Sequence, residues 1–126
     1  MDDLVQFLRD RLDEDERAAH AAPGPSWERR EIRDHDGSFV FEEYVAVADP
    51  GRNKVVLSDV DAEVLPFVLR HDPARVLAEV DAKRQLVARV ENHALLMGRD
   101  EIHGDLLRLL ALPYAGHPDY REEWRP

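Results

Sequence analysis

The spacing of hydrophobic residues divides the chain into a helical start, an extended middle and a helical end. Residues 2–22 repeat apolar side chains at intervals of three and four, which is the period of a helix with one buried face. The apolar positions of this stripe are Leu4, Val5, Leu8, Leu12 and Ala19. The run Pro23-Gly24-Pro25 follows, and proline cannot donate the amide hydrogen bond that a helix needs. The pattern predicts an amphipathic helix over 2–22.

Residues 27–58 are richer in β-branched and aromatic side chains and contain two groups of turn residues, at 34–37 and 49–53. This arrangement predicts a three-stranded antiparallel meander. The middle strand alternates, and we expect one of its faces to point into the core: Phe39, Phe41, Val45 and Val47. The first strand is mostly charged, which is typical of a solvated sheet edge, and its arginines and acidic residues predict a ladder of ion pairs.

Three helices are expected after the meander. Ser58 or Asp59 can cap the first, with an apolar side made of Val60, Val64, Leu65, Phe67 and Val68. Asp72 and Pro73 are a cap and a first helical residue, so a long helix is predicted over 73–97, ending at Gly98. The last helix begins near Asp100 and ends at Pro113. Its inward side chains are expected to be Ile102, Leu106, Leu109 and Leu110.

The long helix 73–97 carries a heptad-like seam that contains one lysine. Its members are Val76, Val80, Lys83, Val87, Val90, Ala94 and Met97. Such a seam indicates helix packing, either within the chain or across a homodimer interface formed by this helix.

The C-terminal tail is unusually aromatic. Tyr114, His117, Tyr120 and Trp124 lie among three prolines, and each ring left in water forgoes roughly 1.5–3 kcal/mol of burial free energy. We therefore expect the tail to dock, either on its own domain or on a partner protein that these four residues bind.

Composition narrows the classes of function. The chain has 126 residues, enough for a single domain over 1–126, and 27 acidic against 17 basic residues give a net charge of −10. This charge disfavours direct contact with nucleic acid, and no apolar run reaches the roughly 20 residues that a membrane helix requires. With no cysteine, disulfide scaffolds and thiolate metal sites are excluded, and a cytoplasmic location is the expectation. The scattered glycines form no nucleotide-binding fingerprint, so no cofactor is predicted.

The only candidate metal ligands that a helical hairpin at Gly98 could bring together are His93, His103 and Asp105. Surface or capping histidines explain the same residues and are the favoured interpretation. A small metal-dependent hydrolase using these three ligands is kept as the alternative, and the sequence favours a protein that is not an enzyme.

Three blocks of the sequence are distinctive. They are the N-terminal block Phe7-Leu-Arg-Asp-Arg-Leu-Asp-Glu-Asp-Glu16, the central block His71-Asp-Pro-Ala-Arg-Val-Leu-Ala-Glu-Val-Asp-Ala-Lys-Arg84 and the terminal block from Leu107 through Pro113-Tyr-Ala-Gly-His-Pro-Asp-Tyr-Arg-Glu-Glu-Trp124. In these blocks the chain resembles an uncharacterised family of short acidic proteins from actinobacteria and their phages. The resemblance implies a domain of unknown function, and no catalytic residue comes with it.

The sequence thus predicts an α+β fold: an N-terminal helix, a three-stranded antiparallel meander, three helices and an aromatic tail. The expected function is that of a small acidic, non-catalytic regulatory or protein-interaction protein. A phage-derived protein of this kind could block a basic, nucleic-acid-binding partner, because acidic and basic surfaces attract. The metal-dependent hydrolase and a structural homodimer remain the alternatives.

Overall fold

The computed structural model describes residues 1–126 and confirms the α+β class. The chain divides into two compact units, a helical unit of residues 1–16 and 78–126 and a sheet unit of residues 17–77. Two long helices, α1 (Asp2–Ala21) and α3 (Pro73–Met97), contribute residues to both units.

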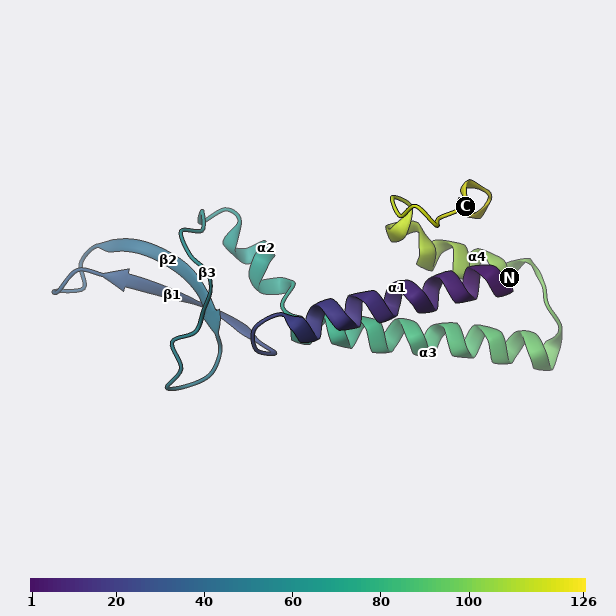
Figure 1. Cartoon of the computed structure of the whole chain (residues 1–126), viewed down its shortest axis with the longest axis horizontal. Helices are drawn as coiled ribbons and strands as arrows, with labels where there is room; N and C mark the ends of the chain where they lie inside the picture. Colours follow the sequence, from purple (N-terminus) through teal and green to yellow (C-terminus); the bar gives the residue numbers. More distant parts are fainter. The chain divides into compact units, whose positions relative to one another are not determined.

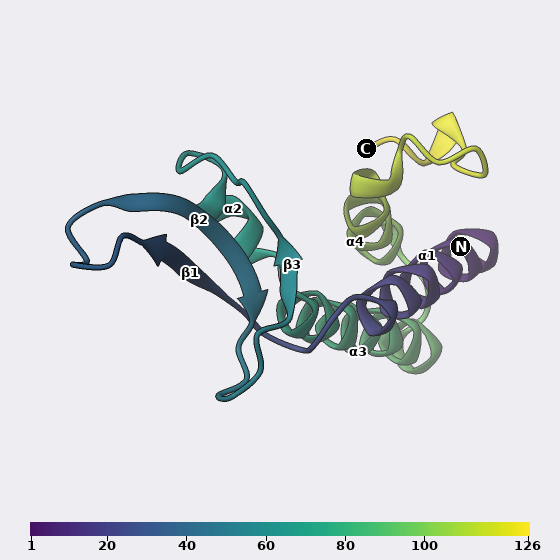
Figure 2. The same cartoon turned by 60° about the vertical axis from the view of Figure 1, so that its left-hand side comes forward.

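The helical unit packs the first half of α1 against α3, α4 (Glu101–Ala111) and the C-terminal tail. Figures 1 and 2 both show α1 beside α3. The predicted apolar stripe of α1 is confirmed, since all of its members are buried: Leu4, Val5, Leu8, Leu12 and Ala19. Phe7, which the stripe did not include, is buried as well and joins the same core as Val87, Val90 and Leu107.

The turn between α3 and α4 follows the signals in the sequence. Gly98, directly after α3, has a φ of +87°, a left-handed conformation that favours glycine. The carboxylate of Asp100 accepts a hydrogen bond from the amide of Ile102 at 3.1 Å and caps α4. The predicted end of the long helix and the predicted start of the last one are therefore confirmed.

The inward face of α4 agrees with the predicted one only in part, since Leu106 and Leu110 pack against the core as predicted. Leu107 and Ala111 are fully buried and His103 is nearly so, whereas Ile102 and Leu109 are 55% and 56% exposed. Buried residues thus recur every four positions from 103. Leucine occupies almost every position between 106 and 112, so the hydrophobic pattern could not define which side of the helix faces the core.

The tail after α4 contains two short 3₁₀ helices, η1 (Leu112–Tyr114) and η2 (Glu122–Trp124). Both tail rings that are most buried, Tyr120 and Trp124, belong to the core of the helical unit. The tail is therefore an ordered part of this unit.

The sheet unit contains the predicted meander. Its strands are β1 (Trp27–Arg33), β2 (Val40–Val47) and β3 (Val55–Leu57), antiparallel and in the order β1-β2-β3. Trp27 pairs with Val47 at one end of the hairpin and Arg33 with Val40 at the other. Charged β1 is an edge strand, as predicted.

The start of β1 is tied to the start of α3. Asp72 accepts hydrogen bonds from the amides of Arg75 at 3.0 Å and Trp27 at 3.3 Å, so one carboxylate caps the helix and holds the strand. The amide of Ala74 also donates to the carbonyl of Pro25 at 2.7 Å. The predicted cap at Asp72 is confirmed, and it has a second role that the sequence did not reveal.

Two expectations for the sheet unit are wrong in part: Val45 and Val47 of the predicted core face are buried, but the two phenylalanines are not. Phe39 and Phe41 are 58% and 66% exposed, and only the C-terminal end of β2, Val45–Val47, is buried. The helix after β3 begins at Leu65, not near Asp59: α2 (Leu65–Arg70) is only six residues long, and Asp59 has a φ of +55°. Of the expected apolar side of this helix Leu65 is buried, while Val64 and Phe67 are largely exposed. A helix this short leaves the hairpin end of the sheet uncovered, and Figure 1 shows the β1–β2 hairpin extending past α2.

Candidate functional site

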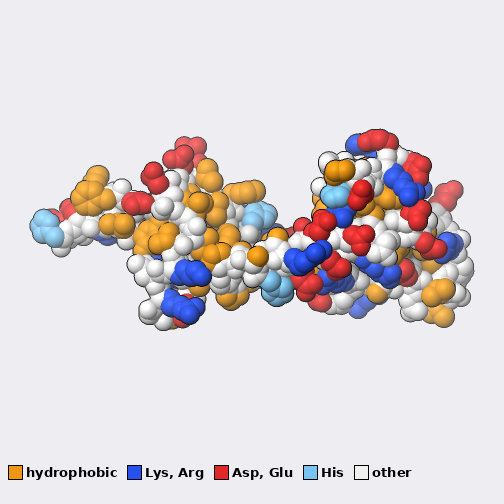
Figure 3. All heavy atoms as spheres, viewed as in Figure 1, with side chains coloured by type: hydrophobic (Ala, Val, Ile, Leu, Met, Phe, Trp, Pro, Cys, Tyr) orange, Lys and Arg blue, Asp and Glu red, His pale blue; other side chains and the backbone are white.

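Large apolar side chains gather on the surface of the sheet unit. Seven of them are between 45% and 67% exposed, and we call this set the apolar sheet surface: Ile32, Phe39, Phe41, Val55, Leu57, Val64 and Phe67. Figure 3 shows hydrophobic side chains over the hairpin, the strands and α2 of this unit. Scattered apolar residues are normal on a protein surface, and the helical unit also exposes seven. The set on the sheet unit differs because three of its members are phenylalanines, and large exposed aromatic side chains are typical of an interaction site.

The two phenylalanines of the hairpin form a preorganised pair. Their rings meet edge to face with centroids 5.0 Å apart. The pairing register shifts between Ile32 and Arg33, whose partners are Glu42 and Val40, so Phe41 has no partner on β1 and lies in a bulge. A bulge redirects side chains, which explains why the simple alternation of β2 did not predict where Phe41 lies.

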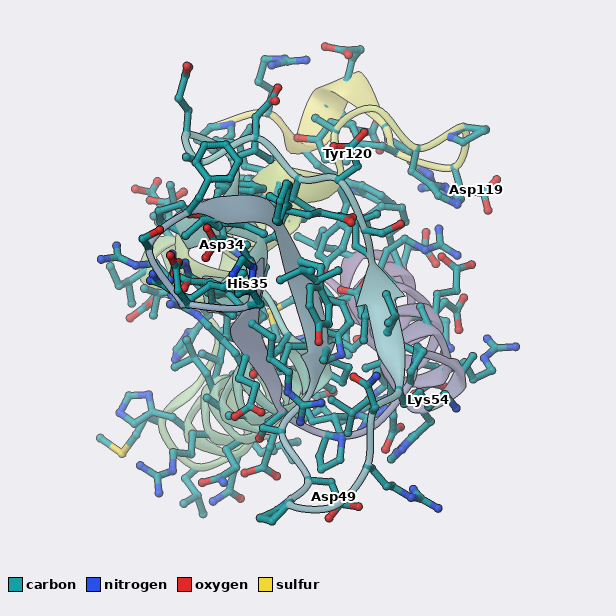
Figure 4. The ribbon with its side chains drawn as sticks, turned by 90° about the vertical axis from the view of Figure 1, so that its left-hand side faces the viewer. Asp34, His35, Asp49, Lys54, Asp119 and Tyr120 are labelled. Atoms are coloured by element: carbon teal, nitrogen blue, oxygen red, sulfur yellow. The ribbon has the colours of Figure 1, made fainter.

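Hydrogen bonds within the hairpin hold the turn before Phe39, in which Asp34 and His35 lie (Figure 4). The amide of Asp34 donates to the carbonyl of Phe39 at 2.9 Å, and the amide of Phe39 donates to the Asp34 carboxylate at 3.2 Å. Ser38 donates to Asp36 at 2.6 Å, and this bond lowers the pKa of the Asp36 carboxyl group. The exposed ring of Phe39 thus lies on an ordered turn, and that of Phe41 follows it in β2.

The edge strand β1 carries the predicted ladder of ion pairs. Arg29 contacts both Glu31 and Glu43, and Arg33 contacts Glu31 at 2.7 Å. The hydrogen bond from Arg29 to Glu43 raises the pKa of the arginine. Burial by itself would raise the pKa of Glu31, but the hydrogen bonds from Arg33 and Arg29 outweigh it and lower this pKa. The arginines are occupied within the strand pair, so they are poorly placed to bind a phosphate group.

α2 adds the third exposed phenylalanine. The ring of Phe67 lies 4.5 Å from the ring of His71, centroid to centroid. The sequence carries no clear signal for this exposed set, since Phe67 lies in the apolar run 64–69 and Phe39 and Phe41 flank Val40. The same residue types in the same pattern also build cores.

The aromatic tail packs on α1 of its own unit. Phe7 is the centre of this packing, with its ring centroid 5.1 Å from Trp124, 5.9 Å from Tyr120 and from His117, and 6.4 Å from Tyr114. Most of these contacts are edge-to-face, the arrangement that aromatic quadrupoles favour. The structure therefore corresponds to the first of the two expected alternatives, docking on the own domain. A partner-binding role for these four residues stays a prediction.

Polar contacts add to the anchoring of the tail. The hydroxyl group of Tyr114 donates to Asp15 at 2.6 Å, and burial, followed by this bond, raises the pKa of the tyrosine. Arg11 is only 6% exposed; it lies 5.0 Å from the Phe7 ring centroid and contacts His117 at 2.8 Å. Sequence reasoning missed Arg11, because an arginine between acidic residues on a helix is usually on the solvent side.

The three candidate metal ligands are only partly brought together. Nδ1 of His93 lies 2.8 Å from Nε2 of His103, whose Nδ1 accepts the amide hydrogen of Asp100 at 3.1 Å as part of the cap of α4. Asp105 contacts Arg108 instead, at 3.3 Å. No group of three or more histidine, aspartate or glutamate side chains is arranged to hold a metal ion. Nothing in the structure supports the hydrolase alternative.

The heptad-like seam of α3 faces inward for most of its length. Val80, Val87, Val90 and Ala94 are buried within the chain, whereas Met97 is 74% exposed. These four residues are therefore not free to meet a second copy. A homodimer through helix 73–97 stays a prediction, and it would have to use another side of the helix.

The two units define an α+β protein, and each unit exposes seven large apolar side chains, with all three exposed phenylalanines on the sheet unit. The chain belongs to the family of unknown function DUF6221, which matches residues 1–126, in agreement with the resemblance seen in the sequence. No curated protein and no solved structure matches the chain. None of its helices combines the length and the apolar character that crossing a lipid bilayer requires.

Proposed function

We propose that this protein is a non-catalytic interaction protein that binds another protein through the apolar sheet surface. The observation that carries the proposal is the exposure of Phe39, Phe41 and Phe67 together with four aliphatic side chains of the same unit. Burying one such aromatic side chain contributes roughly 1.5–3 kcal/mol, and a few well-packed aromatic anchors supply most of the affinity of many interfaces.

The geometry of the hairpin supports a binding role. Phe39 and Phe41 already contact each other, and the turn that carries Phe39 is ordered by the hydrogen bonds of Asp34. A preorganised surface loses less conformational entropy on binding than a flexible one. The apolar sheet surface is therefore suited to dock against an apolar patch of a folded partner.

The distribution of charge favours apolar over long-range electrostatic recognition. Many acidic side chains of the helical unit are paired with arginines, such as Asp13 and Glu16 with Arg84 and Glu91 with Arg9. Figure 3 shows acidic and basic side chains interspersed on the visible face of this unit. A protein that covers a basic nucleic-acid-binding groove needs its acidic groups gathered on one face, so the proposal does not depend on that hypothesis.

Affinity purification from a lysate of the source organism, with nuclease treatment, tests the proposal with two matched double variants. F39S/F41S removes two exposed rings of the apolar sheet surface, and L95S/L96S removes two leucines of the helical unit that are 84% and 75% exposed. We expect one protein to be captured by the wild type and by L95S/L96S and to be lost with F39S/F41S. Circular dichroism confirms that each variant is folded.

Two results would contradict the proposal. A captured protein that binds wild type and F39S/F41S equally would show that the phenylalanines make no contact with it. Equal loss in both double variants would show that capture depends on general surface hydrophobicity rather than on this site.

A further inference from the structure

A groove of about 940 Å³ lies within the helical unit, and no residue of the apolar sheet surface lines it. Its walls come from the start of α1, the beginning of α4 and the end of the tail. The residues that carry the argument are Met1, Leu4, Glu101, Arg108, Glu123 and Trp124. This volume falls in the range of sites that hold a ligand or several residues of a peptide.

The groove carries an excess of acidic charge. Its two arginines are already engaged, Arg99 with Asp2 at 2.9 Å and Arg108 with Asp105 at 3.3 Å. Glu101 has no ion-pair partner in the chain, and Glu123 has only a long contact of 3.7 Å with Arg121. Two carboxylates of the groove are thus left to attract a cation, in a unit with 16 acidic and 9 basic residues.

Trp124, which lines this groove, carries an unused hydrogen-bond donor. The residue is only 8% exposed and is held by Phe7 and by Tyr120, whose ring centroid lies 5.8 Å away. Its indole N–H has no acceptor in the chain, yet this nitrogen is not among the fully enclosed atoms without a partner. The donor therefore remains accessible to a carbonyl group of a ligand.

Apart from Asp100, which caps α4, the rest of the wall is apolar or open. Met1 and Leu4 present hydrocarbon to the groove, and Gly104 has no side chain to narrow it at α4. Lysine and arginine side chains bury their methylene stems along apolar surface while the charged end reaches a carboxylate. The groove offers both kinds of contact, and the indole N–H matches the carbonyl groups of a polypeptide backbone.

From this combination we propose that the groove binds a basic, lysine- or arginine-containing segment of a partner polypeptide. The cationic side chains pair with Glu101 and Glu123, their stems lie on Met1 and Leu4, and a backbone carbonyl accepts from Trp124. This inference rests on residues of the helical unit alone, so it stands or falls independently of the apolar sheet surface.

Nuclear magnetic resonance of the full chain tests the inference through the two indole N–H signals. That of Trp124 is assigned by its proximity to Phe7, and that of Trp27 by its hydrogen bond to the carbonyl of Pro23. The probe is a blocked five-residue peptide with two arginines and one lysine, titrated at low salt. We expect a saturable shift of the Trp124 signal and none of the Trp27 signal.

Charge variants of the two glutamates provide the decisive comparison. E101Q/E123Q is expected to bind the peptide roughly 2- to 30-fold more weakly, as two exposed ion pairs imply. E63Q/D81N removes the same charge from exposed positions outside the groove and is expected to bind like the wild type. The inference is overturned by an unmoved Trp124 signal, by equal weakening in both double variants, or by spermidine producing the same saturable shift as the peptide.

Discussion

Phe7 illustrates how much one side chain contributes to this protein. Phe7 lies in α1 outside the apolar stripe that the sequence predicted, yet four tail residues contact its ring. Burial to 5% exposure removes nearly the whole ring from water. Phe39 is chemically identical and 58% exposed, which makes the two phenylalanines a matched pair for separating structural from surface roles.

Phe7→Ala is expected to destabilise the protein by about 3–5 kcal/mol, because it leaves a cavity where the tail rings meet. Phe39→Ala should change the free energy of unfolding by only about 0.5 kcal/mol, as exposed substitutions usually do. Urea denaturation, followed by tryptophan fluorescence, measures the free energy of unfolding of both variants. Equal effects of the two substitutions would show that the tail does not depend on Phe7.

Single residues determine where α3 and α4 begin and end, and each acts for a clear physical reason. Asp72 begins α3, Asp100 begins α4 and Gly98 ends α3, in each case through a cap or a backbone conformation that these residues favour. The connection from α1 to β1 requires a glycine, both for its backbone conformation and for lack of space. Gly24 has a φ of +61°, and a Cβ atom placed there would lie 2.5 Å from Cγ1 of Val47 in β2.

Gly24→Ala is expected to cost roughly 2–4 kcal/mol, because it adds a left-handed backbone penalty of about 1–2 kcal/mol to a steric conflict inside the sheet unit. Gly51→Ala is the control: its φ is +87°, but nothing lies within 4 Å of the added atom, so only the backbone penalty applies. Thermal unfolding of both variants makes the comparison. If Gly51→Ala is the more destabilising of the two, the close packing of Gly24 on Val47 is refuted.

The whole molecule combines a strong negative charge with exposed apolar surface. A net charge of −10 keeps copies apart at neutral pH, whereas the isoelectric point of about 5.0 removes this repulsion in mild acid. Ion pairs within the helical unit neutralise many of its acidic side chains locally. The repulsion between whole molecules therefore comes from the acidic side chains in excess over the basic ones.

Near pH 5 the wild-type protein should therefore self-associate through its exposed apolar side chains, and F39S/F41S should do so less. Light scattering at matched concentrations between pH 7 and pH 5 measures this difference, with L95S/L96S as the control for general surface hydrophobicity. An unchanged onset of scattering in F39S/F41S would mean that the apolar sheet surface takes no part in association.

Only part of the candidate site could be predicted from the sequence. The sequence predicted that the aromatic residues of the tail are docked, and in the structure they pack on Phe7. It also predicted that Phe39 and Phe41 are core residues, but in the structure both are exposed. In the first case a general preference for burying rings was sufficient. In the second, the outcome depended on a bulge at Phe41 and on the short length of α2, which periodicity does not encode.

By itself the sequence determined the order and type of the elements, because proline, glycine and capping carboxylates act on the few residues next to them. It also determined the α+β class and the charged edge strand, which follow from periods of 3.6 and 2. Only the tertiary structure decided which side of the leucine-rich α4 faces inward, where Arg11 is buried and which phenylalanines meet water. Those outcomes depend on neighbours that are distant along the chain, and a hydrophobic pattern shows which side chains can be buried without showing what will cover them.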